Sequence, residues 1–175
     1  MTSGQWKGVV IVLMLVFISA THAHDGTVNI SGTIQDNTCE LAPDSQNKSI
    51  DMGTFVAAQF SRVGDFSPAK MFTLNLQSCG PAASGATVTF SGTADAHNPD
   101  VFALEAAADS AYGLALGIFD ADGKRIAPGA TSDAVELKPG EASVELDFSA
   151  RYVSVLNSVT AGKGNVTLTF KINYS

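Results

Sequence analysis

The chain has 175 residues, with 10 basic and 17 acidic side chains and a formal net charge of −7. The basic residues are scattered, and Lys124 and Arg125 are the only adjacent pair. Nucleic acids and anionic membrane surfaces are bound by clustered cations, so this composition argues against both as partners. Once the N-terminal leader described below is removed, the length suits one domain with a core of its own.

The first 23 residues are typical of a secretory signal peptide. A short basic segment ends at Lys7, an apolar run covers residues 8–18, and Thr21, His22 and Ala23 form a small-x-small cleavage site. The apolar run is too short to span a bilayer comfortably, so a retained membrane anchor is the weaker interpretation. We therefore expect a signal peptide at residues 1–23 and a mature chain that begins at His24.

Export places the two cysteines of the chain in a compartment where disulfides form. Cys39 and Cys79 are the only cysteines. A metal site would need close ligand pairs such as C-x-x-C, and the sequence has none. We expect a disulfide between Cys39 and Cys79, and neither a metal ion nor another cofactor.

After the leader, short runs of alternating apolar and polar residues follow one another, as in half-buried β-strands. In chain order their apolar positions are Val28, Ile30 and Ile34 with Gly32 in the same register, Cys39 within residues 33–41, Ile50 and Met52, Phe72, Leu74 and Leu76, Ala86, Val88 and Phe90, Leu114, Leu116 and Ile118, and Val144, Leu146, Phe148, Ala150 and Tyr152. Turn residues separate the runs at 42–44, 79–81, 120–123 and 138–140. Residues 101–111 differ, because their Ala- and Glu-rich composition predicts one or two helical turns. The whole pattern predicts an all-β antiparallel sandwich or barrel.

The last eleven residues alternate without a break. The apolar face carries Val166, Leu168, Phe170, Ile172 and Tyr174, and the polar face carries Asn165, Thr167, Thr169, Lys171 and Asn173. An unpaired apolar edge strand is normally protected by charge, proline or a cover, and this one is not. We therefore expect the tail to receive a strand from another molecule. The alternating run at residues 27–34 is a candidate donor, although an internally paired first strand of the domain explains it equally well.

No residue pattern indicates catalysis or metal binding. Asp120 and Asp122 resemble the start of a calcium loop, but the later ligands are missing and Lys124 follows, so we expect a hairpin turn. His97 is not accompanied by a nucleophile motif and is interpreted as a loop histidine. We do not expect an enzyme.

Several motifs, taken in their order and spacing, resemble subunits of chaperone–usher pili, above all those of the type 1 fimbrial group. They are the leader, the alternating run before Cys39, the pair Cys39 and Cys79, Phe90-Ser-Gly-Thr-Ala94, residues 113–120, Phe148-Ser-Ala-Arg-Tyr152, Gly162 and the penultimate Tyr174. The residues around Asp36 and Asn37, and those at 91–98, are most similar to minor tip-fibrillum adaptor subunits. The resemblance covers essentially the whole mature chain.

This resemblance implies an incomplete immunoglobulin-like antiparallel sandwich, which lacks its last strand and is completed in trans by a donor strand. Residues 24–34 would form an N-terminal donor-strand extension, and residues 35–175 would form the pilin domain. The donor positions would be Val28, Ile30, Gly32 and Ile34. The strand that lines the groove and contacts the chaperone would carry Gly162, Val166, Leu168, Phe170, Ile172, Tyr174 and Ser175. Basic residues of the chaperone would bind the terminal carboxylate of Ser175.

The resemblance therefore implies a structural subunit of an adhesive pilus, exported through the periplasm to the bacterial cell surface. Its partners would be a periplasmic pilus chaperone, the outer-membrane usher and the neighbouring pilus subunits. A minor adaptor position in the fibre would suit a chain that has both a donor extension and an acceptor tail. The alternative from another class is a self-contained secreted β-sandwich that pairs its own termini and binds a glycan or receptor.

Overall fold

The computed structural model describes Ser31 and residues 38–175, so the leader and the donor positions Val28, Ile30, Gly32 and Ile34 lie outside the described residues. Residues 38–175 belong to one compact unit. Its strands are β1 (Glu40–Leu41), β2 (Lys70–Gln77), β3 (Gly85–Ser91), β4 (Phe102–Ala103), β5 (Leu114–Asp120), β6 (Arg125–Ile126), β7 (Val135–Glu136), β8 (Ser143–Ser154) and β9 (Thr169–Tyr174). Two short helices, α1 (Pro43–Gln46) and the 3-10 helix η1 (Ala57–Gln59), lie between β1 and β2.

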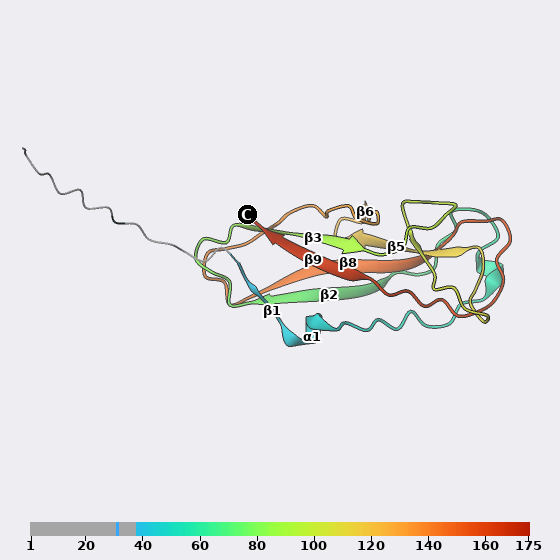
Figure 1. The fold of residues 1–175 in the computed structure, drawn as a ribbon, viewed down its shortest axis with the longest axis horizontal. Helices are drawn as coiled ribbons and strands as arrows, with labels where there is room; N and C mark the ends of the chain where they lie inside the picture. The colour runs from blue at the N-terminus through green and yellow to red at the C-terminus, as the bar shows by residue number, and fades with distance from the viewer. Residues whose placement is uncertain (1–30, 32–37) are drawn as a thin grey trace, which may run out of the picture. The chain divides into compact units, whose positions relative to one another are not determined.

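The strands form two antiparallel sheets (Figure 1). The large sheet has the order β1-β2-β8-β5-β4, with β6 also paired to β5, and the small sheet has the order β7-β3-β9. The longest strand, β8, lies at the centre of the large sheet, where it pairs with β2 on one side and with β5 on the other. The described part of the chain is therefore nearly all β, as the alternating sequence pattern predicts.

The core lies between the two sheets and is built from the apolar positions of the alternating strands. Phe72 from β2, Phe90 from β3 and Phe148 from β8 are all buried. The rings of Phe72 and Phe148 stack with centroids 5.6 Å apart, and the ring of Phe90 meets that of Phe148 edge-on at 5.1 Å. Burial of each such side chain contributes roughly 1.5–3 kcal/mol, so this trio is a major attachment between the sheets.

A disulfide joins Cys39 and Cys79, as predicted. It connects the residue before β1 to the turn after β2, and the two Cα atoms lie 4.0 Å apart. The register of β1 on β2, with Glu40 opposite Gln77, brings the two cysteines to the same end of the large sheet.

The helical prediction for residues 101–111 is wrong. Val101 and Phe102 are fully buried, and Phe102 pairs with Leu116 as part of β4. The residues that follow form a loop in which the hydroxyl of Ser110 donates to the carbonyl of Glu105 at 2.6 Å. Burial of the two large side chains at the start of the segment outweighs the weak helix propensity of its Ala and Glu residues.

The predicted turn at 120–123 is confirmed. The amide of Gly123 donates to the carbonyl of Asp120 at 3.0 Å, and Gly123 has a positive φ of 78°, which favours glycine. The Asp120 carboxylate accepts the amides of Asp122 and Lys124, so it stabilises the hairpin between β5 and β6. His97 lies in an exposed loop, as predicted.

Candidate functional site

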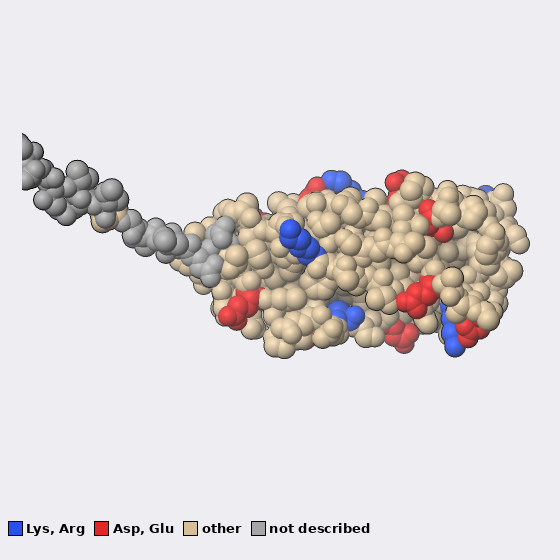
Figure 2. Space-filling view, viewed as in Figure 1, with Lys and Arg blue, Asp and Glu red and all other residues tan. Residues whose placement is uncertain are grey.

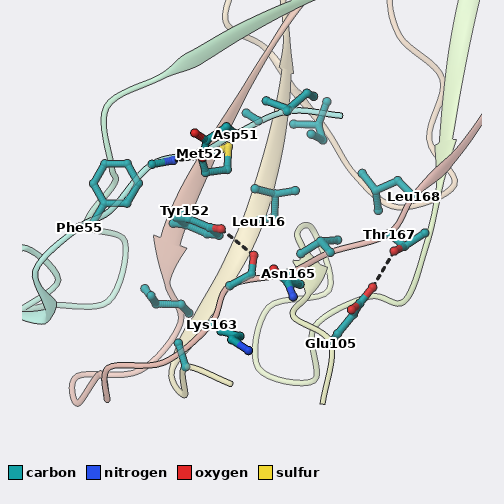
Figure 3. A pocket seen from close by; sticks show the side chains of 18 of the residues that line it. Asp51, Met52, Phe55, Glu105, Leu116, Tyr152, Lys163, Asn165, Thr167 and Leu168 are labelled. Atoms are coloured by element: carbon teal, nitrogen blue, oxygen red, sulfur yellow. Dashed lines mark hydrogen bonds between the residues drawn. The ribbon is translucent and has the colours of Figure 1, made fainter. Parts of the chain in front are cut away.

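A groove of about 1040 Å³ opens between the two sheets (Figure 3). Its floor consists of the apolar core side chains Phe72, Leu74, Phe90, Leu116, Ile118 and Ala150, together with Tyr152. One wall is the segment 46–55, and the other is the final segment of the chain, 159–170, which leads into β9. The groove therefore runs between these two walls and reaches down to the core of the sandwich.

The strand β9 is paired on one side only. Ser175 and Gly85 exchange two backbone hydrogen bonds, of 3.0 and 3.2 Å, at the end of β3 and β9. In an antiparallel pair such residues alternate with residues whose backbone groups point away from the partner strand. Opposite Ile172, Val88 does turn its amide and carbonyl away, to the hydroxyl and amide of Ser132. The backbone groups of Phe170, Ile172 and Tyr174 therefore face away from β3.

The same pattern continues upstream of β9. The carbonyl of Asn165 accepts the amide of Glu105 at 2.8 Å, and the carbonyl of Lys163 accepts that of Ala111 at 2.9 Å. The hydroxyl of Thr167 also donates to the carboxylate of Glu105 at 2.6 Å (Figure 3). Odd-numbered residues thus hold this segment to the rest of the domain, whereas its even-numbered backbone groups face the groove.

We call the backbone groups of Val166, Leu168, Phe170, Ile172 and Tyr174 the open edge. None of them has a hydrogen-bond partner elsewhere among the described residues. The side chains of these five residues are half-buried and pack against the core cluster. The open edge therefore combines an unpaired row of donors and acceptors with an apolar lining, an arrangement that normally belongs to a strand inside a sheet.

The opposite wall is also unpaired. Ile50 and Met52 pack against the core, as their alternation predicts, but residues 48–55 form no strand and make no backbone–backbone hydrogen bond with another described residue. The strand predicted at Ile50 and Met52 is therefore absent, because it has no neighbour to pair with. The ring of Phe55 closes this wall against Tyr152, with centroids 5.9 Å apart.

Two tyrosine hydroxyl groups attach the C-terminal segment of the chain to the large sheet and the residue that precedes it. Tyr174 donates to the carbonyl of Cys39 at 3.1 Å, and Tyr152 donates to the carbonyl of Gly164 at 2.6 Å (Figure 3). Burial raises the pKa of Tyr152, and the charge of Asp51 adds to the shift. Burial also raises the pKa of Tyr174, although the hydrogen bond to Cys39 opposes it. Both hydroxyl groups therefore stay protonated and act as donors at neutral pH.

The structure brings together five of the predicted acceptor residues, namely those of the open edge. Gly162 lies beyond them, where a side chain would come within 2.3 Å of the Ala111 amide nitrogen. Ser175 is held by its own domain, since its carbonyl oxygen accepts the amide and hydroxyl of Ser84. The sequence interpretation missed Tyr152 and Phe55, because an alternating strand and a loop give no signal for a contact across a groove.

Two other kinds of site, a metal cluster and a membrane-spanning helix, are absent from the described residues. None of their His, Cys, Asp and Glu side chains gather in groups of three or more that could hold a metal ion. Within the same part of the chain, no helix has the length and apolar character needed to cross a membrane. Figure 2 shows charged side chains of both signs scattered over one face, without a gathered basic patch.

Comparison with known proteins identifies the family. The profile of the family described as fimbrial protein matches residues 28–175. The chain is 41% identical to the uncharacterized fimbrial-like protein YcbV of Escherichia coli K12 over 87% of each chain. It is 37% identical to the probable major fimbrial subunit LpfA of Escherichia coli O157:H7, over 90% of this chain and 88% of the relative.

The fold agrees with this assignment. A solved type I fimbria protein of Burkholderia pseudomallei, 34% identical, superposes with a TM-score of 0.61 over 79% of this chain and 90% of its own. The two-sheet arrangement is that of a pilin sandwich, which is immunoglobulin-like and incomplete in the described residues. The chain belongs to the fimbrial protein family, and it is a structural subunit of a surface pilus rather than an enzyme.

Proposed function

We propose that the groove is an acceptor for a donor strand. An extended segment of another protein adds to the open edge and places alternate side chains on the apolar floor, which is a form of β-augmentation. The coincidence of two features at the same five residues carries this proposal. Their side chains face the core, and their backbone donors and acceptors have no partner among the described residues.

Two different strands would occupy the groove in succession. A periplasmic chaperone fills the groove first, and at the outer-membrane usher the N-terminal extension of a neighbouring subunit replaces the chaperone strand. The extension of this chain, residues 24–34, would complete the groove of the subunit assembled before it in the same way. Its inward positions would be Val28, Ile30, Gly32 and Ile34. Burial of the three aliphatic side chains would contribute on the order of 5–9 kcal/mol before ordering costs.

A glycine among the inward positions suits a point of close approach to the groove floor. An internal, adaptor position in the fibre also remains our proposal, since the sequence has both a donor run and an acceptor edge. The self-contained, receptor-binding sandwich is less well supported. It would have to tolerate an unprotected apolar edge beside a groove that reaches the core.

Deletion of residues 24–33 tests whether the N-terminal extension acts only as a donor for another subunit, while the C-terminal strand forms the acceptor groove. The truncated subunit keeps its own core, disulfide and open edge, so we expect it to be recovered with the chaperone at a level close to that of the full chain. It cannot complete the groove of the subunit assembled before it, so it should not be incorporated into fibres. Co-purification with the chaperone and electron microscopy of assembled fibres measure the two outcomes separately.

A matched substitution is Gly32→Leu. We expect the larger side chain to slow incorporation into fibres while the chaperone complex persists, because overpacking an apolar pocket typically costs about 1–3 kcal/mol. Loss of chaperone-bound protein on truncation would instead make residues 24–33 an internal strand of the domain, and the donor role would have to be abandoned.

A further inference from the structure

The groove has two ends, and they differ. At one end, Tyr174 reaches from the small sheet to the carbonyl of Cys39, while Ser175 is fastened to Gly85. At the other end, Tyr152 reaches from the large sheet to the carbonyl of Gly164. Gly164 and Tyr174 are ten positions apart along extended chain, which corresponds to roughly 30 Å. The two tyrosines therefore mark opposite limits of the open edge.

Gly164 is the next even-numbered residue before the open edge, but its carbonyl oxygen already has a hydrogen-bond partner. Its carbonyl accepts the hydroxyl of Tyr152, whereas the carbonyls of the five open-edge residues have no partner among the described residues. A side chain at this position would also collide with Tyr152. A Cβ atom on Gly164 would lie 2.6 Å from the phenolic oxygen and 2.9 Å from Cε1 of that ring. The tyrosine thus occupies the space that residue 164 would otherwise fill.

Beyond Gly164 the segment can no longer act as a sheet edge. Lys163 pairs with Ser110 in parallel, whereas Thr160 pairs with Tyr112 in antiparallel fashion. Between them, Gly162 lies so close to the backbone of Ser110 that a Cβ would meet its carbonyl carbon at 2.4 Å. A strand that followed the open edge past Val166 would therefore meet the Tyr152 ring first. It would then meet the backbone crossing, where the chain around Gly162 lies directly against the backbone of Ser110.

We propose that Tyr152 is the register stop of the groove, which ends the pairing of an incoming strand at Val166. This inference rests on the proposed function, since it concerns where a donor strand is seated. A strand that alternates apolar and polar residues can slip only in steps of two, because a slip of one turns its apolar side chains outward. Because Tyr152 closes the far end, a donor strand that shifted two residues toward Gly164 would find no free carbonyl there and would collide with the tyrosine ring.

The register can be measured with a synthetic peptide of residues 24–34 that carries a photo-cross-linker at one inward position. The mature full chain is incubated with an excess of this peptide, irradiated, and digested for mass spectrometry. We expect the wild-type chain to be cross-linked at one residue of the open edge. In Tyr152→Leu, the cross-links should spread to a second position, two residues nearer Gly164. Tyr112→Leu is the control, because Tyr112 is exposed outside the walls of the groove, and it should leave the cross-link at a single residue.

A measurement on the unsubstituted protein covers the case in which Tyr152→Leu does not fold. The carbonyl carbons of Val166, Leu168, Phe170 and Ile172 should change their chemical shifts when the peptide binds, whereas that of Gly164 should not. A comparable change at Gly164, or a single cross-link position shared by the wild type and folded Tyr152→Leu, overturns the register stop. Absence of any peptide-induced change along the open edge would instead contradict the acceptor function itself, so the two failures are distinguishable.

Discussion

The phenolic hydroxyl of Tyr174 donates a hydrogen bond to the carbonyl oxygen of Cys39 at 3.1 Å. Tyr174 is the last residue of β9, and Cys39 is fixed by its disulfide to Cys79. The open edge of the small sheet is therefore attached to the large sheet at the disulfide. A change in either residue should affect the groove as well as the stability of the domain.

The combined substitution Cys39→Ser with Cys79→Ser should destabilise the domain. Loss of a native disulfide from a small secreted domain typically costs about 2–5 kcal/mol of unfolding free energy. Urea unfolding of the exported protein measures this cost. Tyr174→Phe is the matched control, because it removes only the hydrogen bond to the Cys39 carbonyl and should cost about 0.5–1.5 kcal/mol. Equal costs for the two changes would mean that the disulfide does little for the folded domain.

Phe170→Asp should abolish capture by the chaperone. Phe170 is half-buried, and its ring lies 6.3 Å from that of buried Phe90 on the groove floor, so a carboxylate there would enter an apolar groove without a partner. The adjacent Lys171 is exposed on the other face of β9, and Lys171→Asp should have little effect. Co-purification of each variant with the chaperone makes the comparison. Similar, mild losses for both would show that the groove face is not what the chaperone contacts.

The two groove tyrosines should titrate at higher pH than exposed tyrosine. Burial raises the pKa of Tyr152 and of Tyr174, so the folded protein retains these protons more tightly than the unfolded chain does. The free energy of unfolding should therefore not vary through these two groups below a pH of about 10, and should fall as the pH rises through their raised folded-state values. Ultraviolet absorbance of tyrosinate follows the titration, and Tyr152→Phe should remove one late-titrating group. Titration of Tyr152 and Tyr174 at the ordinary tyrosine value would contradict the burial of their hydroxyl groups.

Much of the fold could be predicted from the sequence, because strands with one buried face have a period of two. The apolar positions of β2, β3, β5, β8 and β9 are found in the strands where the alternation predicts them. Alternation reports burial rather than pairing, however. Ile50 and Met52 are packed against the core as expected, yet they form no strand since no neighbour supplies the hydrogen bonds.

The site could be predicted only in part, for the same reason. The five residues of the open edge follow from the alternation of the tail. The partner of Tyr152 does not, because the loop that carries Gly164 to its hydroxyl has no periodicity. The helix prediction for residues 101–111 is wrong because it rests on local composition alone. Contacts with strands distant in the sequence bury Val101 and Phe102 and decide the structure of this segment.

Gly164→Ala should destabilise the domain through Tyr152 and not through the backbone. Gly164 is not among the residues with positive φ, so alanine brings no backbone strain there. The added Cβ would, however, lie 2.6 Å from the Tyr152 hydroxyl oxygen and 2.7 Å from Cζ, so the ring must move. Overpacking of this kind typically costs about 1–3 kcal/mol.

A double-mutant cycle isolates this contact. Tyr152→Leu removes the hydroxyl and the edge of the ring, and in that background Gly164→Ala should cost less than about 0.5 kcal/mol, the limit within which independent sites are additive. Thermal or urea unfolding of the four proteins, each with the residue 24–34 peptide bound, measures the cycle. The remaining difference is the interaction energy between the two positions. If Gly164→Ala is equally costly with Tyr152 and with Leu at position 152, then the tyrosine does not fill the space beside Gly164, and the end of the groove is closed by the backbone crossing alone.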